Sequence, residues 1–198
     1  MKLLHIDSSA LGAQSVTRDL SAAIVAHWSA SVDGLRLEYR DLDRDPLPHL
    51  TAGSLAKADP EQAAEAERTL DQFLQADVVV IGAPMYNFTI PSTLKAWIDR
   101  IAVAGRTFRY TENGPQGLAG GKRVIVASGR GGVHTGAATD FQEPYLRQLF
   151  AFLGVEDVEF VRAEGVAYSP QHRADALAAA RASIPSPRPA SEALRVAA

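Results

Sequence analysis

A hydroxyl-rich segment near the N-terminus has the composition of a phosphate-binding loop. Residues 7–17 read Asp-Ser-Ser-Ala-Leu-Gly-Ala-Gln-Ser-Val-Thr, with four hydroxyl side chains and one glycine ahead of a segment of helical character. The free amide groups and the positive dipole end of a helix N-terminus favour a bound phosphate. The segment has no lysine, although Arg18 could approach an anion. A polar turn in which Thr17 caps the helix is the competing interpretation.

An aromatic loop follows a strongly apolar run. Residues 84–91 read Pro-Met-Tyr-Asn-Phe-Thr-Ile-Pro. The two prolines stiffen its ends, the aromatic and methionine side chains offer apolar surface, and Asn87 provides both a donor and an acceptor. This combination suits a flat heterocycle with a hydrogen-bonding edge. The alternative is a rigid surface loop whose aromatic rings pack into the core.

A glycine-rich stretch forms the third candidate loop. Residues 128–134 read Ser-Gly-Arg-Gly-Gly-Val-His, and three glycines in four positions allow the backbone to approach a ligand closely. Backbone amides there would stabilise the negative charge that an isoalloxazine ring gains on reduction. A flexible connection is the alternative for this loop taken alone. Together the three loops indicate a mononucleotide flavin, and FMN is preferred over FAD because no adenylate pocket is evident.

The composition argues against several other kinds of protein. A net charge of −3 lacks the basic excess of a nucleic-acid-binding surface, and the absence of cysteine excludes disulfides, thiolate metal sites and a cysteine nucleophile. The five histidines are scattered without metal-ligand spacing, so we predict no metal site. A dinucleotide fingerprint and a serine-hydrolase elbow are also missing. Without a secretory signal or an apolar stretch of about 20 residues, we expect a soluble cytoplasmic protein that binds neither nucleic acid nor membrane.

A parallel sheet would bring these three loops together. Short apolar runs predict buried strands at residues 3–6, 35–39, 78–83, 123–127 and 158–161, and helical segments lie at 17–28, 60–75, 92–104, 143–153 and 170–182. This alternation predicts an α/β fold with helices on both faces of the sheet and ligands beyond the carboxyl ends of its strands.

Local signals refine the expected elements. Ser92 is the expected N-cap of its helix, Gly154 is the expected stop of the next helix, and residues 106–121 suggest a small hairpin. We predict one domain over residues 1–183. The tail over residues 184–198 is rich in proline, and we expect it to be poorly ordered.

Three long motifs occur in order along the chain. They read Met85-Tyr86-Asn87-Phe88, then Thr-Phe-Arg-Tyr-Thr-Glu-Asn-Gly-Pro at 107–115, then Ser-Gly-Arg-Gly-Gly at 128–132. With them the chain resembles the FMN-dependent NADH azoreductase family, and the likeness extends from the first strand to about residue 169. The resemblance implies a flavodoxin-like three-layer sandwich with a five-stranded parallel sheet of order 2-1-3-4-5. It also implies a homodimer with an FMN site at each end of the interface.

The resemblance implies an activity as well. Two electrons would pass from NADH or NADPH through FMN to small aromatic quinones in a ping-pong cycle, and azo bonds would be cleaved to amines. No catalytic side chain is assigned, because flavin N5 accepts the hydride and delivers it to the acceptor. Two other functions stay open: a flavodoxin-like electron carrier that does not itself oxidise NAD(P)H, and a structural or regulatory domain without cofactor. The choice between NADH and NADPH and the physiological acceptor are left open.

The candidate site residues fall into three groups, of which the resemblance implies the first two and the position of His134 in the chain gives the third. Those for the cofactor, from phosphate to pyrimidine end, are Ser9, Ser15, Val16, Thr17, Met85, Tyr86, Asn87, Phe88, Gly129, Arg130, Gly131 and Gly132. Tyr110 and Phe152 are candidate walls for the acceptor, and His134 follows the glycine loop closely enough to meet a substrate. Arg130 departs from the family pattern and leaves donation at position 129 to the backbone. The proline-rich tail has no assigned counterpart.

Overall fold

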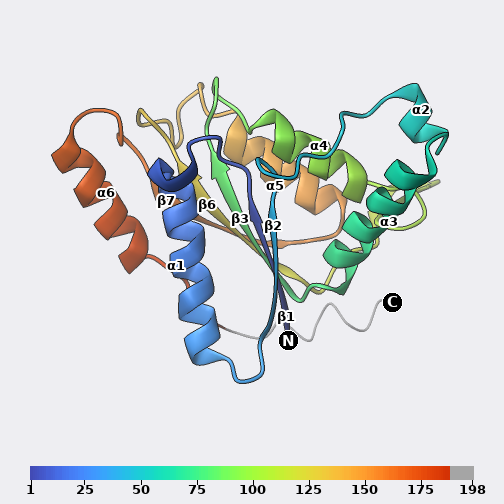
Figure 1. The fold of residues 1–198 in the computed structure, drawn as a ribbon, viewed down its shortest axis with the longest axis horizontal. Coiled ribbons are helices and arrows are strands. Elements are labelled where there is room, and N and C mark those ends of the chain that lie inside the picture. Colours follow the sequence, from blue (N-terminus) through green and yellow to red (C-terminus); the bar gives the residue numbers. More distant parts are fainter. Residues whose placement is uncertain (188–198) are drawn as a thin grey trace.

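One parallel β-sheet forms the centre of the molecule (Figure 1). The structure is a computed structural model that describes residues 1–187. The sheet has the order β2-β1-β3-β6-β7, and its strands are β1 (Lys2–Asp7), β2 (Arg36–Asp41), β3 (Val78–Pro84), β6 (Arg123–Gly129) and β7 (Asp157–Ala163). The numbers 4 and 5 belong to a separate hairpin. Counted along the chain, the strands of this sheet therefore stand in the order 2-1-3-4-5.

Helices cover both faces of this sheet, as the alternation of segments predicts. α1 (Val16–Ser31) and α6 (Pro170–Ala182) lie on one face, and α3 (Pro60–Gln75), α4 (Ser92–Ile101) and α5 (Gln142–Phe152) lie on the other (Figure 1). Every residue of β3 and β6 is buried, because both faces of these central strands are covered. A short 3-10 turn at Gly12–Gln14 and α2 (Ala52–Leu55) are not predicted, since three or four residues are too few to show a helical period.

The sheet separates two apolar cores. On the face of α1 and α6, Trp28 is fully buried among Leu20, Ile24 and the side chains of one sheet face. On the opposite face, Trp97 of α4 meets Phe73 of α3 edge-on, with ring centroids 5.9 Å apart. The two cores hold the strands rigidly, and the strands therefore fix the loops that leave their carboxyl ends.

Two helix ends differ from the sequence-based expectation. Ser15, not Thr17, caps α1, because its side chain accepts a hydrogen bond from the Arg18 amide. The prediction of Ser92 as an N-cap is wrong: Ser92 is the first helical residue, and the Pro91 carbonyl accepts from the Lys95 amide.

The C-terminal ends show what stops each helix. α4 ends at Ile101 instead of residue 104, because the Thr107 hydroxyl donates to the Ile101 carbonyl (2.6 Å) and accepts from the Val103 amide (2.9 Å). The predicted stop at Gly154 is confirmed, with a left-handed φ of +89° just after α5.

The predicted hairpin is present after α4. It consists of β4 (Phe108–Thr111) and β5 (Gly114–Gly117), paired antiparallel. Gly117 packs on the backbone after α5, where a Cβ atom would lie only 2.1 Å from the Gly154 nitrogen. Among residues 1–187, no helix is long and apolar enough to cross a membrane.

The predicted tail is described only at its start. Residues 188–198 lie outside the described residues, so poor order there stays a prediction. Within the described part, Ile184 packs against the core on the α1 side, and Arg123 donates from Nη1 to the Ser186 carbonyl at 3.0 Å.

Candidate functional site

The three predicted loops meet in one cleft at the carboxyl ends of β1, β3 and β6. The cleft has a volume of about 280 Å³. Its lining comes from all three loops, from the loop after β7 and from α6: Ser9, Leu11, Ser15, Val16, Thr17, Pro84, Met85, Tyr86, Gly129, Gly131, Val166, Ala167 and Arg173. Eight of the twelve predicted cofactor residues therefore lie together. The last two segments carry no recognisable motif, which is why the sequence-based site omits them.

The phosphate end of the predicted site is the start of α1. Ser15, Val16 and Thr17 are all buried, and the hydroxyls of Ser15 and Thr17 are 3.1 Å apart. The amides of Val16 and Thr17 belong to the first helical turn and have no partner within the helix, so they are available to an anion. The first turn of α1 thus has the geometry of an anion-binding helix terminus.

Tyr86 links the predicted phosphate-binding loop (residues 7–17, the phosphate loop) to the aromatic loop (residues 84–91). Its hydroxyl lies 3.1 Å from the Ser9 hydroxyl and accepts a hydrogen bond from the Ala10 amide at 3.2 Å. Ser9 itself is fully buried. The sequence indicates Tyr86 as a ring contact, whereas the structure gives its hydroxyl the additional task of holding the first loop in place.

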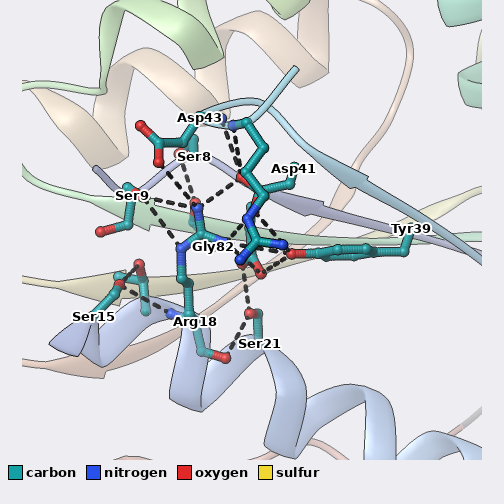
Figure 2. A network of polar contacts seen from close by, with 12 residues as sticks. Ser8, Ser9, Ser15, Arg18, Ser21, Tyr39, Asp41, Asp43 and Gly82 are labelled. Carbon is teal, nitrogen blue, oxygen red and sulfur yellow. Dashed lines mark hydrogen bonds and ion pairs between the residues drawn. The ribbon is translucent and has the colours of Figure 1, made fainter. Parts of the chain in front are cut away.

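Arg18 does not line this cleft, although the sequence places it next to the phosphate loop. Its guanidinium makes a bidentate pair with Asp41 at 2.6 and 2.7 Å, and it donates twice to the Ser9 carbonyl, at 2.9 and 3.2 Å (Figure 2). Arg18 lowers the pKa of Asp41 through these hydrogen bonds. The pair therefore anchors the phosphate loop from behind and leaves no donor of Arg18 in the cleft.

A polar network behind the loop joins the ends of β1, β2 and β3 (Figure 2). Tyr39 donates to Asp7 at 3.1 Å, and Ser21 donates to the other Asp7 oxygen at 2.8 Å. Burial, reinforced by the negative charge of Asp7, raises the pKa of Tyr39 to about 12. Gly82 is required beside this network, because a Cβ atom there would lie 2.4 Å from the Asp7 carboxylate.

The aromatic loop is a two-residue turn with an unusual backbone. The amide and carbonyl of Tyr86 pair with those of Thr89 at 2.9 and 3.1 Å, and both intervening residues are left-handed, Asn87 at φ 49° and Phe88 at φ 69°. Such turns favour asparagine at the first of these positions, so Asn87 has a backbone role besides its predicted ligand contact.

Asn87 and Phe88 lie beside the cleft and do not line it. Asn87 borders an adjoining cleft of about 560 Å³ together with Lys95 and Tyr145. Phe88 is half exposed and meets His134 edge-on, with ring centroids 5.8 Å apart. The ring of His134 also lies 2.9 Å from the Thr139 hydroxyl. Asn87 and Phe88 are thus predicted cofactor residues that lie outside the lining of this cleft.

The glycine loop is held in place by the loop after β7. The carbonyls of Arg130, Gly131 and Gly132 accept hydrogen bonds from the amides of residues 166, 167 and 165 at 3.0 to 3.2 Å. Gly129 packs directly on α1, where a Cβ atom would lie 2.9 Å from a Thr17 methyl group. This stretch is a pinned loop, not the flexible connection that the sequence leaves open.

Arg130 turns away from the cleft. Its side chain is fully buried and donates to Asp140 at 2.8 Å, to Glu164 at 3.2 Å and to Ser128 at 3.1 Å. A contact of Arg130 with a cofactor, as predicted, would have to come from its backbone, because the charge of its side chain is already compensated in the interior. The sequence could not show the two acids, which are 10 and 34 residues away.

Gln142 is a supporting residue that the sequence does not reveal. It is fully buried at the start of α5, where it donates to the carbonyls of Ala83 and Pro84 at 3.1 and 3.0 Å and accepts from Ser128 at 2.7 Å. It thus ties together the ends of β3 and β6, from which two of the cleft loops leave.

The predicted acceptor walls lie apart from this cleft. Tyr110 is 76% exposed and meets Phe108 edge-on, and Phe108 packs on Phe152 with a centroid distance of 4.4 Å. The ten-residue α4 separates this aromatic group from the aromatic loop, a length of about 15 Å. Neither Tyr110 nor Phe152 lines the cleft of its own chain. Residues 1–187 also contain no cluster of histidine and acidic side chains that could hold a metal ion.

Comparison with known proteins places the fold in a family. A family model described as a flavodoxin-like fold matches residues 1–186. The chain belongs to this flavodoxin-like family. Among its flavodoxin-like relatives, the FMN-dependent NADH:quinone oxidoreductase of Stenotrophomonas maltophilia (strain K279a) is 67% identical over 186 residues, 94% of this chain and 95% of that protein. The protein of the same name from Xanthomonas oryzae pv. oryzae (strain MAFF 311018) is 71% identical over 184 residues, 93% of this chain and 95% of its own length.

Solved structures of azoreductases have a similar fold. An azoreductase from Bacillus anthracis str. Sterne superposes with a TM-score of 0.84 at 30% identity, over 93% of this chain and 96% of that one. An FMN-dependent NADH-azoreductase from Bacillus anthracis str. Ames Ancestor, in complex with FMN, has a TM-score of 0.83 at 28% identity, over 92% of this chain and 95% of that one. The similarity therefore spans nearly the whole flavodoxin-like domain.

Proposed function

We propose that this chain is an FMN-dependent NADH:quinone oxidoreductase that also cleaves aromatic azo bonds to amines. One observation carries the proposal: the hydroxyl, aromatic and glycine loops converge on a single cleft of about 280 Å³. The relatives that are 67% and 71% identical are named for this quinone activity, and the solved structures are named azoreductases.

The residues of the cleft fit FMN. The buried hydroxyl of Ser15 and the amides of Val16 and Thr17 suit the phosphate, because they combine donors with the positive end of the α1 dipole. Met85 gives an apolar wall for the ring, and its amide is already paired with the Gly129 carbonyl at 2.9 Å. Among residues 1–187, the amide of Gly131 donates to no other group, so it is free for the pyrimidine edge.

The chain contributes binding and orientation to the reaction. FMN, when bound, supplies the two-electron chemistry, because its N5 accepts a hydride from a nicotinamide and transfers it to an acceptor. The Gly131 amide would stabilise negative charge at the pyrimidine edge, and the hydrogen bonds from residues 165–167 to the glycine loop support this role by holding that amide in position. The Tyr86 hydroxyl keeps the phosphate loop at a fixed distance from the ring wall.

A direct assay tests the proposal. We expect the purified protein to be yellow or to take up FMN, and to oxidise NADH with a benzoquinone or an azo dye as acceptor. A flavodoxin-like electron carrier would bind FMN yet need a partner reductase, and it would accumulate a semiquinone. A colourless protein that fails to bind added FMN would overturn the proposal. Parallel assays with NADPH decide the donor, for which the names of the relatives favour NADH.

We also propose that the chain acts as a homodimer, in the cytoplasm. Tyr110 and Phe152 lie at the far end of α4 from the cleft, so a second copy is needed for them to wall an acceptor site. Sedimentation analysis should give twice the chain mass. A Tyr110→Ala variant should raise the KM for quinones while FMN affinity is unchanged; a monomer with unaltered KM would contradict this arrangement.

A further inference from the structure

The phosphate loop contributes no cation to the phosphate end of the cleft. A phosphate monoester carries about −1.5 to −2 charges at neutral pH, and amides with hydroxyls supply only partial positive charge. Residues 7–17 have no lysine or arginine. Arg18, the next residue, is occupied by Asp41 and the Ser9 carbonyl. Any full positive charge at this end of the cleft therefore comes from another element.

Arg173 of α6 is the cationic residue that lines the cleft. It shares the lining with Ser15, Val16 and Thr17, although it is 159 residues away from Gln14, its hydrogen-bond partner. Its Nη2 donates to the Gln14 carbonyl at 2.8 Å, which places the guanidinium beside the residue that precedes the helix cap. Among residues 1–187, no carboxylate lies within ion-pair distance of Arg173. Arg173 also borders an adjoining cleft of about 510 Å³ together with Asp19, Asp41 and Asp43, but it forms no ion pair with any of them. Its guanidinium is therefore not ion-paired next to the free amides of α1.

The surroundings of Arg173 fix its position. α6 begins rigidly, with Pro170 as its first residue and Ser169 as its cap, and the Ser169 hydroxyl accepts from the His172 amide. The preceding loop, 165–167, is hydrogen-bonded to the glycine loop. Arg173 thus stands on an element that is attached both to the phosphate end and to the pyrimidine end of the cleft.

We propose that Arg173 binds the 5′-phosphate of FMN and supplies the positive charge that the phosphate loop lacks. The proposal rests on the proposed function, since it assigns a residue to the same cofactor. It makes the C-terminal helix part of the cofactor site. A guanidinium held by one backbone carbonyl keeps its other donors free, and these can form a charge-assisted pair with phosphate oxygens.

Riboflavin and FMN differ only in the phosphate, so their relative affinities isolate this contact. The experiment measures the binding of both flavins to apoprotein by quenching of flavin fluorescence, in the wild type and in Arg173→Met. Methionine keeps an unbranched apolar chain of similar length and removes the charge. We expect the FMN affinity to fall about tenfold or more and the riboflavin affinity to stay within about twofold. The dependence of FMN affinity on salt should also weaken.

Arg181→Met provides the matched control. Arg181 lies on the same helix and pairs with Asp19 at 2.7 Å, away from the cleft lining. It should leave the ratio of FMN to riboflavin affinity unchanged, and Arg173→Lys should restore part of the ratio. Thermal unfolding of the apoproteins identifies any variant that fails to fold, and if Arg173→Met does so, Arg173→Gln, which also removes the charge, replaces it in the comparison.

The outcomes separate the two proposals. Equal losses of FMN and riboflavin affinity, or no loss, would overturn the role of Arg173 while leaving the proposed function intact. A rise only in the KM for NADH would instead assign Arg173 to the nucleotide donor and would also overturn it. Failure of the wild type to bind FMN at all would overturn the proposed function together with this inference.

Discussion

At the scale of single residues, Asp41 is expected to matter for FMN although it does not line the cleft. Asp41→Asn removes the charge that holds Arg18 on the Ser9 carbonyl, so the phosphate loop loses its anchor. The side chains are 16% and 9% exposed, so solvent screening reduces the effect only in part. We expect a loss of about 1–2 kcal/mol in the free energy of unfolding and weaker FMN binding, measured by urea denaturation and fluorescence titration.

Asp43 provides the control for this prediction. It lies 3.8 Å from the same guanidinium but is 40% exposed, so Asp43→Asn should change stability by less than about 0.5 kcal/mol. If Asp41→Asn and Asp43→Asn have the same effect on FMN affinity, the anchoring role of the bidentate pair is wrong. The comparison separates a specific geometry from the general charge of this surface.

At the scale of elements, the turn at residues 86–89 separates the two roles of Asn87. Asn87→Ala should lower the stability of the FMN-free protein by about 1 kcal/mol, because alanine is strained at a φ of 49°. Asn87→Gly removes the same amide without that strain and should preserve stability. Both variants should weaken FMN binding by about 1–3 kcal/mol if the amide meets the ring edge. Unchanged FMN affinity in Asn87→Gly would reduce Asn87 to a turn residue.

At the scale of the whole molecule, Lys122 links the pH of the solution to global stability. It is buried between the end of α3 and the start of β6 and donates to the carbonyls of Leu74 and Ala76. Burial lowers the pKa of Lys122 from 10.5 to about 8. The unfolded chain therefore holds this proton more tightly, and the contribution of Lys122 to the free energy of unfolding rises from pH 8 to pH 10.5.

Denaturation at several pH values measures this linkage. The stability of the wild type relative to Lys122→Met should increase as the pH rises through 8 toward 10.5. Lys95→Met removes a half-exposed lysine on α4 and should show no such change below about pH 10. A difference between wild type and Lys122→Met that is independent of pH would contradict the assignment.

Much of the architecture is predictable from local pattern. Apolar runs and helical periods give five strands and five helices of the α/β fold, because burial of such segments is decided over a few residues. The three loops are also predictable, since hydroxyls, glycines and a proline-bounded aromatic run keep their chemistry in any context. The ends of helices are less predictable from the sequence. Ser92 is not the cap of α4, because the helix begins at the Pro91 carbonyl. The same helix ends where the hydroxyl of Thr107, six residues further along the chain, donates to the Ile101 carbonyl.

The sequence by itself determined which chemistry this protein can offer, in the loops at 7–17, 84–91 and 128–134. Only the tertiary structure decided which charges face the cleft. Arg18 and Arg130 are adjacent to these loops in sequence, yet Asp41, Asp140 and Glu164 turn both away from the cleft. Arg173 is remote in sequence and lines the cleft, because α6 packs beside α1. The position of a charged side chain depends on partners that are distant in the sequence, as Asp41 is for Arg18 and Asp140 is for Arg130. No local sequence pattern reveals such partners.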